Sequence, residues 1–377
     1  MRILLVISGL GIGGAEKQVV LLSKELCRRG HAVCVYTLTN ETSRADELTD
    51  GAAELLVDSK SMRLDPGVLF RLRRHILVWK PDIVHGFLFD GNIYARLAAI
   101  STGIPVLDSE RNDGYALSEL QTLGYSLTAK LSRGIVANSH AGAQFASSKY
   151  LRAGQNCHVV WNGIDLNEVD RRLSPPPTVA RRIFPGDNLK RVVVVGTIKP
   201  QKDQLLAMRV ARRLVDADAR WRMIVVGDEL SRKATDYKQQ VVKAHDELGL
   251  HDFVRFVGSR RDVPEIMASS DVVLVTSHHE GFPNVVLEAM ACRTPVVSTD
   301  YSDVKKILPM NWQVVPSRNE GDLLMAVLRC DREHDMVASA QRRWVETHAT
   351  AGICAEHLLS IYSLYATTVS ATAEQTG

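Results

Sequence analysis

The sequence contains no apolar run that approaches the roughly 18 residues needed by a membrane-spanning helix. Its first apolar stretch, residues 3–7, is short and leads into glycines, without the cleavage segment of a signal peptide. We interpret this stretch as a buried strand. Together these absences predict a cytoplasmic protein, and they leave open a peripheral contact with the inner face of the membrane.

Cysteine is scarce and the charges nearly cancel. None of the six cysteines forms a C-x-x-C pair, which excludes the common zinc and redox motifs. Most of them lie in apolar runs, as expected for buried thiols in a reducing compartment. The formal net charge is +3, from 46 basic and 43 acidic side chains. So small a surplus argues against nucleic acid as a partner.

The sequence does contain an alternation of apolar strands and amphipathic helices, which occurs twice. In the first half, strands are expected at residues 3–7, 32–37, 54–57, 82–86, 105–108 and 134–137. The helices between them are expected at residues 15–29, 68–79, 91–101, 116–132 and 141–152. Such alternation indicates an α/β fold with a doubly wound parallel sheet.

The alternation pauses over residues 171–190, which are rich in proline and charge and are typical of a stiff linker. It then restarts, with strands expected at 191–195, 221–226, 253–257, 271–276 and 295–299. Helices are expected at 204–215, 233–248, 285–292, 320–330 and 353–367. Because 377 residues exceed one ordinary core, we predict two Rossmann-like domains, at 1–170 and 191–350, followed by a helix at 351–367 and a frayed tail at 368–377.

Residues 280–291, E-G-F-P-N-V-V-L-E-A-M-A, follow an expected strand and open an expected helix. A helix N-terminus presents unsatisfied N–H groups and partial positive charge, so a pyrophosphate would bind well there. Gly281 allows close approach of the backbone to a ligand. Glu280 on the loop could accept hydrogen bonds from sugar hydroxyls, and Glu288 on the helix could hold those of a ribose. The plain alternative is a solvated helix face.

The string from Glu280 to Asp300 closely resembles the E-x7-E region of the retaining family 4 glycosyltransferases, also called group 1. The resemblance covers almost the whole chain and implies the GT-B fold, in which two Rossmann-like domains face each other across a cleft. It assigns the acceptor to the first domain and the nucleotide-sugar donor to the second, and implies that the last helix crosses back to the first domain. It implies donor contacts from Glu280, Gly281, Phe282, Pro283, Asn284 and Glu288.

A second segment, V-G-T-I-K-P-Q-K-D over residues 195–203, agrees with the resemblance. Lys202 matches a lysine that neutralises the donor diphosphate in the family, which implies a catalytic role beside Glu280. Thr197 stands where the family usually has an arginine, so one diphosphate contact is in doubt, and Lys199 is the candidate to replace it. Taken alone, Lys202 would be interpreted as a surface lysine.

The loop after the first expected strand reads G-I-G-G-A-E from residue 11 to residue 16. As a dinucleotide fingerprint it is incomplete, because the second expected strand ends in T-L-T-N without an acidic residue, and this counts against NAD. The resemblance implies that Gly13 and Gly14 face the donor phosphate and the acceptor, with Glu16 on the acceptor side. The alternative is a tight turn without a ligand.

The segment S-E-R-N, residues 109–112, ends another expected strand. The family often has a histidine here that meets the reacting hydroxyl, so the resemblance places Arg111 and Asn112 on the acceptor side. An arginine exposed at a strand end is the alternative. The segments 136–139 and 161–165 resemble the elements that close the family's first domain, and we expect a structural role for them.

The resemblance also implies a mechanism, in which the acceptor hydroxyl attacks on the sugar face from which the nucleoside diphosphate leaves. Lys202 and the helix N-terminus after Gly281 would stabilise the charge on the diphosphate. We see no Asp-x-Asp motif suited to a metal ion. We therefore expect no metal ion and no cofactor, since the nucleotide-sugar is a substrate. The two glutamates belong to sugar and ribose, and are not a glycosidase pair.

The resemblance predicts transfer of a hexose or N-acetylhexosamine, with a UDP-sugar favoured, to a saccharide or lipid-linked saccharide in surface-polysaccharide or glycan assembly. The alternatives are a nucleotide-sugar epimerase or phosphorylase of the same shape, an NAD-dependent Rossmann enzyme and a non-catalytic nucleotide-binding protein. Arginines 71, 73 and 74 accompany an apolar stripe on the helix at 68–79. This helix either touches a membrane or packs on the sheet with its arginines in solvent, and we favour packing.

Overall fold

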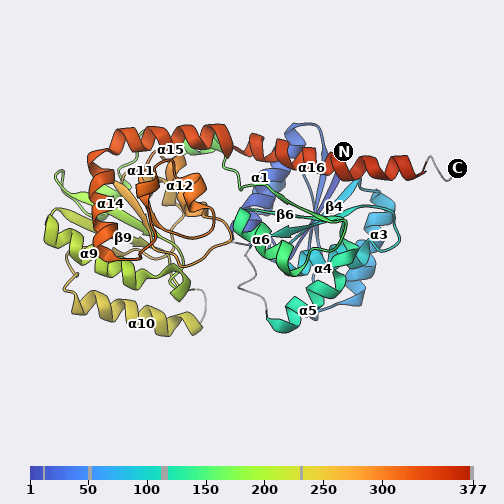
Figure 1. Cartoon of the computed structure of the whole chain (residues 1–377), viewed down its shortest axis with the longest axis horizontal. Helices are drawn as coiled ribbons and strands as arrows, with labels where there is room; N and C mark the ends of the chain where they lie inside the picture. Colours follow the sequence, from blue (N-terminus) through green and yellow to red (C-terminus); the bar gives the residue numbers. More distant parts are fainter. Residues whose placement is uncertain (12, 50–52, 112–117, 230–231, 374–377) are drawn as a thin grey trace. The chain divides into compact units, whose positions relative to one another are not determined.

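The structure is a computed structural model that describes residues 1–11, 13–49, 53–111, 118–229 and 232–373. The chain divides into two compact units (Figure 1). Unit 1 combines residues 1–163 with the segment from residue 349 onward, and unit 2 is Ile164–His348. Each unit is built on its own parallel sheet, so two Rossmann-like units are present as expected.

Unit 1 contains a seven-stranded sheet in the order β3-β2-β1-β4-β5-β6-β7, in which every pairing is parallel. Its strands are β1 (Arg2–Ile7), β2 (Ala32–Thr37), β3 (Glu54–Val57), β4 (Ile83–Phe87), β5 (Val106–Glu110), β6 (Gly134–Ala137) and β7 (Asn156–Val159). On β1, Ile3 and Leu5 belong to one core cluster, whereas Leu4 and Val6 belong to another. The sheet is therefore buried on both faces, which explains the uninterrupted apolar run.

The helices of unit 1 cover both faces of this sheet. They are α1 (Gly14–Arg28), α2 (Ala45–Thr49), α3 (Pro66–Trp79), α4 (Leu88–Ala98), α5 (Glu119–Thr128), η1 (Ala129–Leu131), α6 (His140–Lys149) and α16 (Ala351–Ala373). Helices α1, α2 and α16 contribute to the core cluster of one face, and α3 and α4 to that of the other. The first face thus combines segments from the two ends of the described chain.

Helix α16 is the last helix of the chain and packs on α1 and β4 of unit 1. Leu358, Ile361 and Tyr362 are buried in the same cluster as Leu22 and Leu26 of α1. The helix extends to Ala373, so residues 368–373, which we expected to be frayed, are helical. The rest of the expected tail, residues 374–377, lies outside the described residues.

Unit 2 contains a six-stranded sheet in the order β10-β9-β8-β11-β12-β13, again with parallel pairings. Its strands are β8 (Lys190–Val195), β9 (Trp221–Val226), β10 (Val254–Phe256), β11 (Val272–Val275), β12 (Val296–Thr299) and β13 (Val314–Val315). Strands β8 and β11 lie side by side in the middle of this order, and the chain winds outward from them in opposite directions. A ligand site is expected where the winding reverses, at the carboxyl ends of the strands.

The longer helices of unit 2 are α9 (Gln204–Ala217), α10 (Arg232–Glu247), α12 (Asn284–Ala291), α14 (Glu320–Arg332) and α15 (His334–His348). The short ones are α7 (Leu166–Arg172), α8 (Val179–Ile183), η2 (Pro200–Lys202), α11 (Val263–Ala268), α13 (Val304–Ile307) and η3 (Asn311–Gln313). Among the described residues, no helix of either unit is both long and apolar enough to cross a membrane.

The segment 171–190, which we expected to be a linker, is part of unit 2. It contains α8, which packs on α11, and its Ala180 and Phe184 are buried. The backbone N–H of Ala180 donates to Ser269 Oγ at 2.9 Å. The proline-rich segment is therefore packed against the rest of unit 2 and is not a free linker. The chain passes between the units at residues 163–164 and 348–349.

Candidate functional site

The motif residues of unit 2 gather at the carboxyl ends of β8 and β11. These two strands pair in parallel, with Val272 opposite Val192, so the segments that follow them leave the sheet at the same edge. Residues 196–203 follow β8, and residues 276–283 follow β11. The structure thus brings together two motifs that are about 80 residues apart in sequence, at the point where a doubly wound sheet binds ligands.

Lys202 and Glu280 form an ion pair at this edge. Lys202 Nζ lies 2.7 Å from Glu280 Oε2, and the two side chains are 14% and 13% exposed. Ser277 Oγ donates to the other carboxylate oxygen of Glu280 at 2.5 Å. Burial and the nearby carboxylate of Glu280 both raise the pKa of Tyr301 well above its ordinary value. Glu280 therefore contacts the ammonium group of Lys202 and the hydroxyl of Ser277, and it lies near the buried ring of Tyr301.

Two glycines allow the backbone to form this arrangement. Gly196, directly after β8, has φ +148°, and a Cβ built there would lie 3.2 Å from Lys202 Cε, so the lysine stem passes over it. Gly227, after β9, has φ +129°, and a Cβ there would lie only 2.1 Å from the carbonyl oxygen of Gly196. Both positions favour glycine by conformation and by space.

Asp203 ends the turn and begins the next helix. It has φ +46°, and its Oδ1 accepts a hydrogen bond from the N–H of Leu206 as the N-cap of α9. Thr276 Oγ1 donates to the carbonyl of Lys202 at 2.8 Å. The turn that carries Lys202 is thus fixed both to α9 and to the end of β11.

Arg318 is part of this site, and our interpretation of the sequence missed it. Its Nη2 donates to Asp203 Oδ2 at 2.5 Å, and its Nη1 donates to the carbonyl of Ser277 at 3.0 Å. It therefore ties together the two segments that carry Lys202 and Glu280. No local pattern points to it, because it lies 115 residues from Asp203 in sequence.

The N-terminus of α12 faces the same edge without a side-chain cap. Pro283 is the N-cap residue and supplies no side-chain hydrogen bond. The carbonyl of Gly281 accepts from Ser302 Oγ at 3.0 Å, and Phe282 is buried, so the loop before the helix is fixed. Asn284 is the first residue of α12, and Glu288, half-buried, lies one turn further on. The helix end offers backbone N–H groups and partial positive charge to an anion.

Lys199 lies in the same turn as Lys202, with its side chain half-buried. Burial and the charge of Lys202 both lower the pKa of Lys199, while Glu280 opposes the shift. At position 197, where the family usually has an arginine, the threonine carbonyl accepts from Gln204 Nε2 at 3.0 Å. The turn 199–202 therefore places two lysines near the carboxylate of Glu280, an arrangement that suits an anion.

The glycine loop of unit 1 follows β1, whose neighbours in the sheet are β2 and β4. Gly13 is the N-cap residue of α1, and Gly14 is exposed. The carboxylate of Glu16 folds back over the loop, so that a Cβ on Gly13 would lie 2.1 Å from Glu16 Oε2. A side chain larger than hydrogen at position 13 would therefore displace the carboxylate of Glu16.

Arg111 follows β5 and turns inward. Its Nη1 donates to Asn162 Oδ1 at 2.9 Å, its guanidinium lies 4.9 Å from the centre of the Phe87 ring, and its Nε is buried without a hydrogen-bond partner among the described residues. Burial is the main reason why the pKa of Arg111 is lowered to about 10. Its expected neighbour Asn112 lies outside the described residues. Arg111 is thus not a solvated surface arginine.

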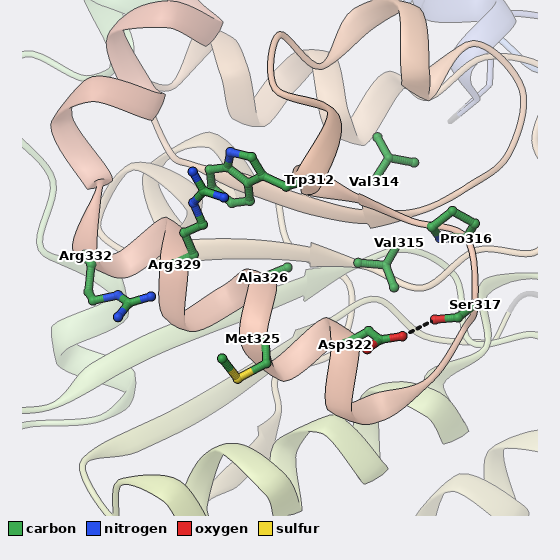
Figure 2. A pocket seen from close by; sticks show the side chains of 10 residues that line it. All are labelled: Trp312, Val314, Val315, Pro316, Ser317, Asp322, Met325, Ala326, Arg329 and Arg332. Carbon is green, nitrogen blue, oxygen red and sulfur yellow. Dashed lines mark hydrogen bonds between the residues drawn. The ribbon is translucent and has the colours of Figure 1, made fainter.

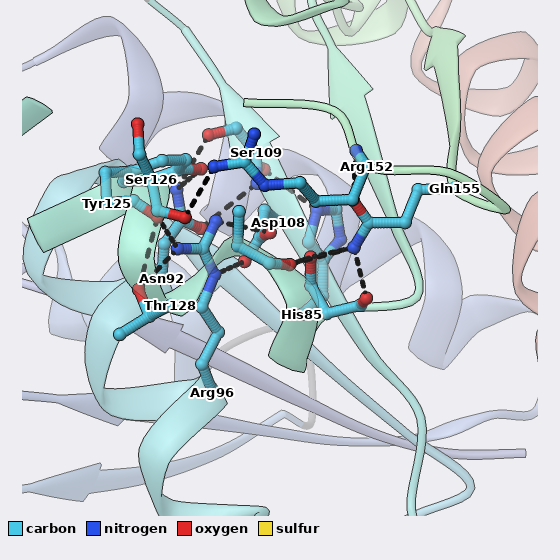
Figure 3. A network of polar contacts seen from close by, with 12 residues as sticks. His85, Asn92, Arg96, Asp108, Ser109, Tyr125, Ser126, Thr128, Arg152 and Gln155 are labelled. Atoms are coloured by element: carbon cyan, nitrogen blue, oxygen red, sulfur yellow. Dashed lines mark hydrogen bonds and ion pairs between the residues drawn. The ribbon is translucent and has the colours of Figure 1, made fainter. Parts of the chain in front are cut away.

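A network of buried polar side chains fixes the end of β5 (Figure 3). Arg96 and Asp108 form a fully buried ion pair with Nη2–Oδ2 and Nε–Oδ1 distances of 2.8 and 3.0 Å. The side chain of Asn92 donates to the carbonyl of Ser109 and accepts from its N–H. His85 bonds to Ser109 Oγ through Nε2 and to the Tyr362 hydroxyl of α16 through Nδ1, at 2.8 and 2.7 Å. The position of Arg111 therefore depends on α16.

The segment 161–165 contacts both Arg111, through Asn162, and α1, through Gly163. Gln18 of α1 exchanges two hydrogen bonds with the backbone of Gly163, at 2.8 and 2.9 Å. Gly163 also lies against α16, since a Cβ there would be 3.1 Å from Cys354 Sγ. Asp165 is the N-cap residue of α7 and accepts from the N–H of Glu168. These contacts support the structural role expected for this segment.

Our interpretation of the sequence overlooked one Asp-x-Asp triplet, at residues 216–218. Asp216 pairs with Arg212, and Asp218 pairs with Arg220. The triplet lies between the end of α9 and the start of β9, which is the amino edge of the sheet. It is therefore at the opposite edge from Lys202 and Glu280.

A hollow of about 700 Å³ in unit 2 lies elsewhere than the motif residues (Figure 2). It is bordered by β13, the edge strand, and by one face of α14, with Trp312 and Arg329 at one end. The guanidinium of Arg329 lies 4.3 Å from the centre of the Trp312 ring. None of the motif residues of unit 2 lines this hollow, so we base the candidate site on the chemistry at the ends of β8 and β11.

Comparison with known sequences finds two family models in succession. The model described as "Glycosyltransferase Family 4" matches residues 12–168, and that described as "Glycosyl transferases group 1" matches residues 189–331.

D-inositol 3-phosphate glycosyltransferase from Mycobacterium sp. (strain KMS) is 30% identical over 232 residues, which are 58% of this chain and 51% of that protein. The protein of the same name from Streptosporangium roseum is 29% identical over 356 residues, covering 81% and 80%. The chain thus matches only about half the length of the first of these relatives.

Comparison with solved structures finds Anabaena HepE, determined in complex with UDP and with UDP-glucose. The UDP complex has a TM-score of 0.82 at 19% sequence identity, and the match covers 96% of this chain and 100% of that chain. Identity this low establishes the fold alone. The GT-B class expected from the sequence, with two parallel-sheet α/β units, is confirmed.

Proposed function

Because the chain belongs to the group 1, family 4 glycosyltransferases, we propose that it transfers a sugar from a nucleotide-sugar donor to an acceptor hydroxyl with retention of configuration. The observation that carries the proposal is the cluster at the ends of β8 and β11, where Lys202, Glu280 and the uncapped N-terminus of α12 lie at one edge. This cluster combines donors for a diphosphate with a carboxylate that can accept hydrogen bonds from a sugar.

The donor is a UDP-linked hexose or N-acetylhexosamine. HepE, which shares the fold, binds UDP and UDP-glucose, and this supports the choice. Glu288 would hold the ribose hydroxyls from the second turn of α12, and Lys199 and Lys202 would contact the diphosphate. Gly281 to Asn284 would form the backbone wall of the donor site.

The ion pair suggests how the donor is accommodated. In the structure Lys202 Nζ contacts Glu280 Oε2 at 2.7 Å, and both side chains are largely buried. A diphosphate would compete for Lys202 and release one oxygen of Glu280, which could then accept a hydrogen bond from a hydroxyl of the transferred sugar. Ser277 would hold the other oxygen throughout. Donor binding and positioning of Glu280 would thus be coupled.

The chemical step is a displacement at the anomeric carbon. The acceptor oxygen forms a bond to that carbon on the face from which the nucleoside diphosphate departs, and the bond from the carbon to the phosphate oxygen breaks. The leaving phosphate takes the proton of the acceptor hydroxyl, so atoms and charge balance without another reactant. The protein contributes positioning and stabilisation of the diphosphate charge by Lys202 and α12, and no metal ion is needed for it. Glu16 and Arg111 are assigned to the acceptor.

The acceptor is a lipid-linked saccharide, as in surface-polysaccharide or glycan assembly, and a peripheral membrane contact would accompany it. Helix α3 buries Val68, Leu72 and Ile76 on the sheet but leaves Phe70, Leu77 and Val78 exposed by 68%, 49% and 75%. Phe70, Arg74, Leu77 and Val78 follow at i, i+4, i+7 and i+8 and so share the outer face of the helix. An exposed apolar stripe with a cation is suited to an anionic lipid surface.

The proposal is tested by screening nucleotide-sugars for slow hydrolysis without acceptor, with liquid chromatography of the nucleotide products. We expect UDP release from one or a few UDP-sugars and its loss in Lys202→Ala. An acceptor screen should follow, with lipid-linked saccharides and, since the curated relatives are named for it, an inositol phosphate. Nucleotide binding without any turnover would indicate a sensor, and a changed sugar still linked to UDP would indicate an epimerase.

The membrane contact has its own test. We expect the full chain to sediment with vesicles containing anionic phospholipid more than with neutral vesicles, and Phe70→Ser with Val78→Ser to reduce this binding. The exposed pair Leu123→Ser and Leu127→Ser on α5 is the matched control, since these leucines are 55% and 67% exposed. Equal loss with both pairs would argue against a specific contact through α3.

A further inference from the structure

The end of α10 in unit 2 carries three side chains with metal-ligating atoms, outside the site described above. The ring nitrogens of His245 and His251 and a carboxylate oxygen of Asp246 all lie within 4.8 Å of one another. His245 Nδ1 is 2.9 Å and His251 Nδ1 is 3.8 Å from Asp246 Oδ1. The two imidazole rings lie edge to face with their centres 4.8 Å apart. Two imidazoles thus converge on one carboxylate oxygen.

The backbone produces this convergence through the way α10 ends. Gly249 adopts the left-handed conformation with φ +61°. Its N–H donates to the carbonyl of Asp246 at 3.0 Å, and the N–H of Leu250 donates to the carbonyl of His245 at 3.1 Å. These two bonds form a Schellman motif, which reverses the chain directly after the helix. The reversal returns His251 to the last turn of α10, beside a residue six positions earlier.

The spacing fits one small cation. Ligands bound to zinc at about 2.0–2.2 Å in a tetrahedral site lie about 3.4 Å apart. The two nitrogen–oxygen distances of 2.9 and 3.8 Å lie on either side of that value, and all three ligand atoms lie within 4.8 Å of one another, so small shifts of the side chains would complete the site. Asp246 and His251 are exposed, so solvent can reach the site and supply a fourth ligand, whereas His245 is 9% exposed and packs on Phe256. One ligand is therefore fixed and two can adjust.

We propose that His245, Asp246 and His251 bind a divalent first-row transition metal ion, of which zinc is the best match. Imidazole nitrogens favour zinc, nickel or copper, whereas magnesium and calcium prefer sites made of oxygen. A simple histidine–aspartate hydrogen bond would explain only part of the arrangement. His334 and Asp335 form such a pair, with Nδ1 and Oδ1 3.2 Å apart, but they belong to no cluster of three such ligands among the described residues.

The ion would join the last turn of α10 to the segment that leads into β10. This site is at the amino edge of the sheet, because His251 precedes β10, whereas Lys202 and Glu280 follow β8 and β11 at the carboxyl edge. The metal therefore stabilises unit 2 and takes no part in sugar transfer. A ligand that binds only the folded state raises the melting temperature in proportion to the logarithm of its concentration once it exceeds the Kd.

The test titrates Zn²⁺ into the full chain by calorimetry and repeats the measurement with His251→Ala, Asp246→Asn and His334→Ala. We expect one zinc ion per chain with a Kd in the micromolar range, weakened by about tenfold or more in the first two variants, and unchanged in His334→Ala. Zinc should also raise the melting temperature of the wild type and of His334→Ala more than that of His251→Ala. Because Asp246 and His251 are exposed, these substitutions should not impair folding.

Three outcomes would overturn the proposal. The first is the absence of stoichiometric binding to the wild type. The second is zinc binding of equal strength in His251→Ala and Asp246→Asn, which would place the ion elsewhere. The third is an equal loss in His334→Ala, which would indicate unspecific binding by surface histidines. Failure of sugar transfer would not bear on any of these measurements.

Discussion

In unit 2 the charges at the carboxyl ends of β8 and β11 lie against charges of opposite sign, whereas in unit 1 the half-buried arginine that follows β5 donates to a neutral amide. Lys202 contacts the carboxylate of Glu280, but Arg111 donates to the amide oxygen of Asn162. Both places are carboxyl edges of parallel sheets with similar winding. Among the described residues, the lysine of unit 2 thus has a direct ionic partner, whereas the arginine of unit 1 has an amide as its side-chain hydrogen-bond partner.

The largest effect should come from Lys202→Ala. We expect a loss of about 10²–10³ in kcat/KM, because one of the charges that stabilise the leaving diphosphate disappears and Glu280 loses its partner. The measurement is UDP release at varied donor concentration. Lys199→Ala is the matched control, from the same turn but without an ion pair to Glu280 among the described residues, and it should lose less. Equal losses would show that the ion pair does not distinguish the two lysines.

The two glutamates should separate binding from turnover. Glu288→Ala should weaken UDP binding by about tenfold or more, because a ribose loses its bidentate acceptor, whereas Glu280→Ala should mainly lower kcat. Calorimetric titration with UDP and steady-state kinetics check the two halves. If both variants lose UDP affinity equally, the assignment of one glutamate to ribose and the other to sugar is wrong.

Arg111→Met tests the role of the half-buried arginine in unit 1. We expect acceptor-dependent turnover to fall by about tenfold or more, with donor hydrolysis unchanged and melting temperature equal or higher, since burying a charge beside one neutral acceptor disfavours the folded state. Gel-based or chromatographic acceptor assays and thermal melting check this. A variant that melts much lower than the wild type would show that Arg111 is mainly structural.

The pKa of Arg111 adds a pH signature. Burial lowers it to about 10 from an ordinary value of 12.5, so the folded chain releases this proton at a lower pH than the unfolded chain. Stability from this group is therefore reduced below pH 10 and recovers as the pH rises above 10. The difference in melting temperature between wild type and Arg111→Met should be larger at about pH 8 than at about pH 11.

A smaller effect is expected from Tyr362→Phe in α16. This change removes the hydroxyl that bonds to buried His85, and we expect a loss of about 1–2 kcal/mol in the stability of unit 1. Tyr365→Phe is the matched control, since Tyr365 bonds to His158 at 3.0 Å in a half-buried place. Urea unfolding monitored in unit 1 measures both. A larger loss for the control would contradict the role given to the His85 network.

The smallest effect should follow removal of metal ions. We expect turnover in excess EDTA to equal turnover without it, because Lys202 and α12 meet the charge of the diphosphate. Loss of activity on chelation, with rescue by Mg²⁺ or Mn²⁺, would overturn this part of the proposed function. The melting temperature of a zinc-loaded sample should fall on chelation even though its activity does not.

Much of the architecture is readable from local pattern. Buried runs such as Ile3–Ile7 and the motif at Glu280 have strong local signatures, and the expected strands and α12 lie close to their expected positions, whereas the edge strands β7 and β13 were not among those expected. Helix α15 was missed because its buried face includes Gln341 and Arg342, which hide the apolar period. Arg342 is accommodated by Asp170, 172 residues away, and by the carbonyl of Ala291.

What the sequence did not predict at the site also depends on contacts between residues that are far apart in sequence. Lys202 and Glu280 were expected there from motifs, but the ion pair between them, the tie through Arg318 and the burial of Arg111 depend on contacts across long sequence separations. The linker was misplaced because proline content reports local stiffness and not packing, and α8 buries Ala180 and Phe184 within unit 2. Local chemistry thus identifies candidates, and tertiary contacts decide their charge environment.

The return of α16 to unit 1 has a consequence for synthesis on the ribosome. His85 and Tyr362 are 277 residues apart, so the core that α1 shares with α16 stays open until the last helix has emerged. Unit 2 is continuous in sequence and can complete its core earlier. Domains usually mature in the order in which they are translated. Of the two units, the one whose translation begins earlier is therefore completed later, and its apolar face with Val19, Leu22 and Leu26 would be open to chaperones while unit 2 is translated.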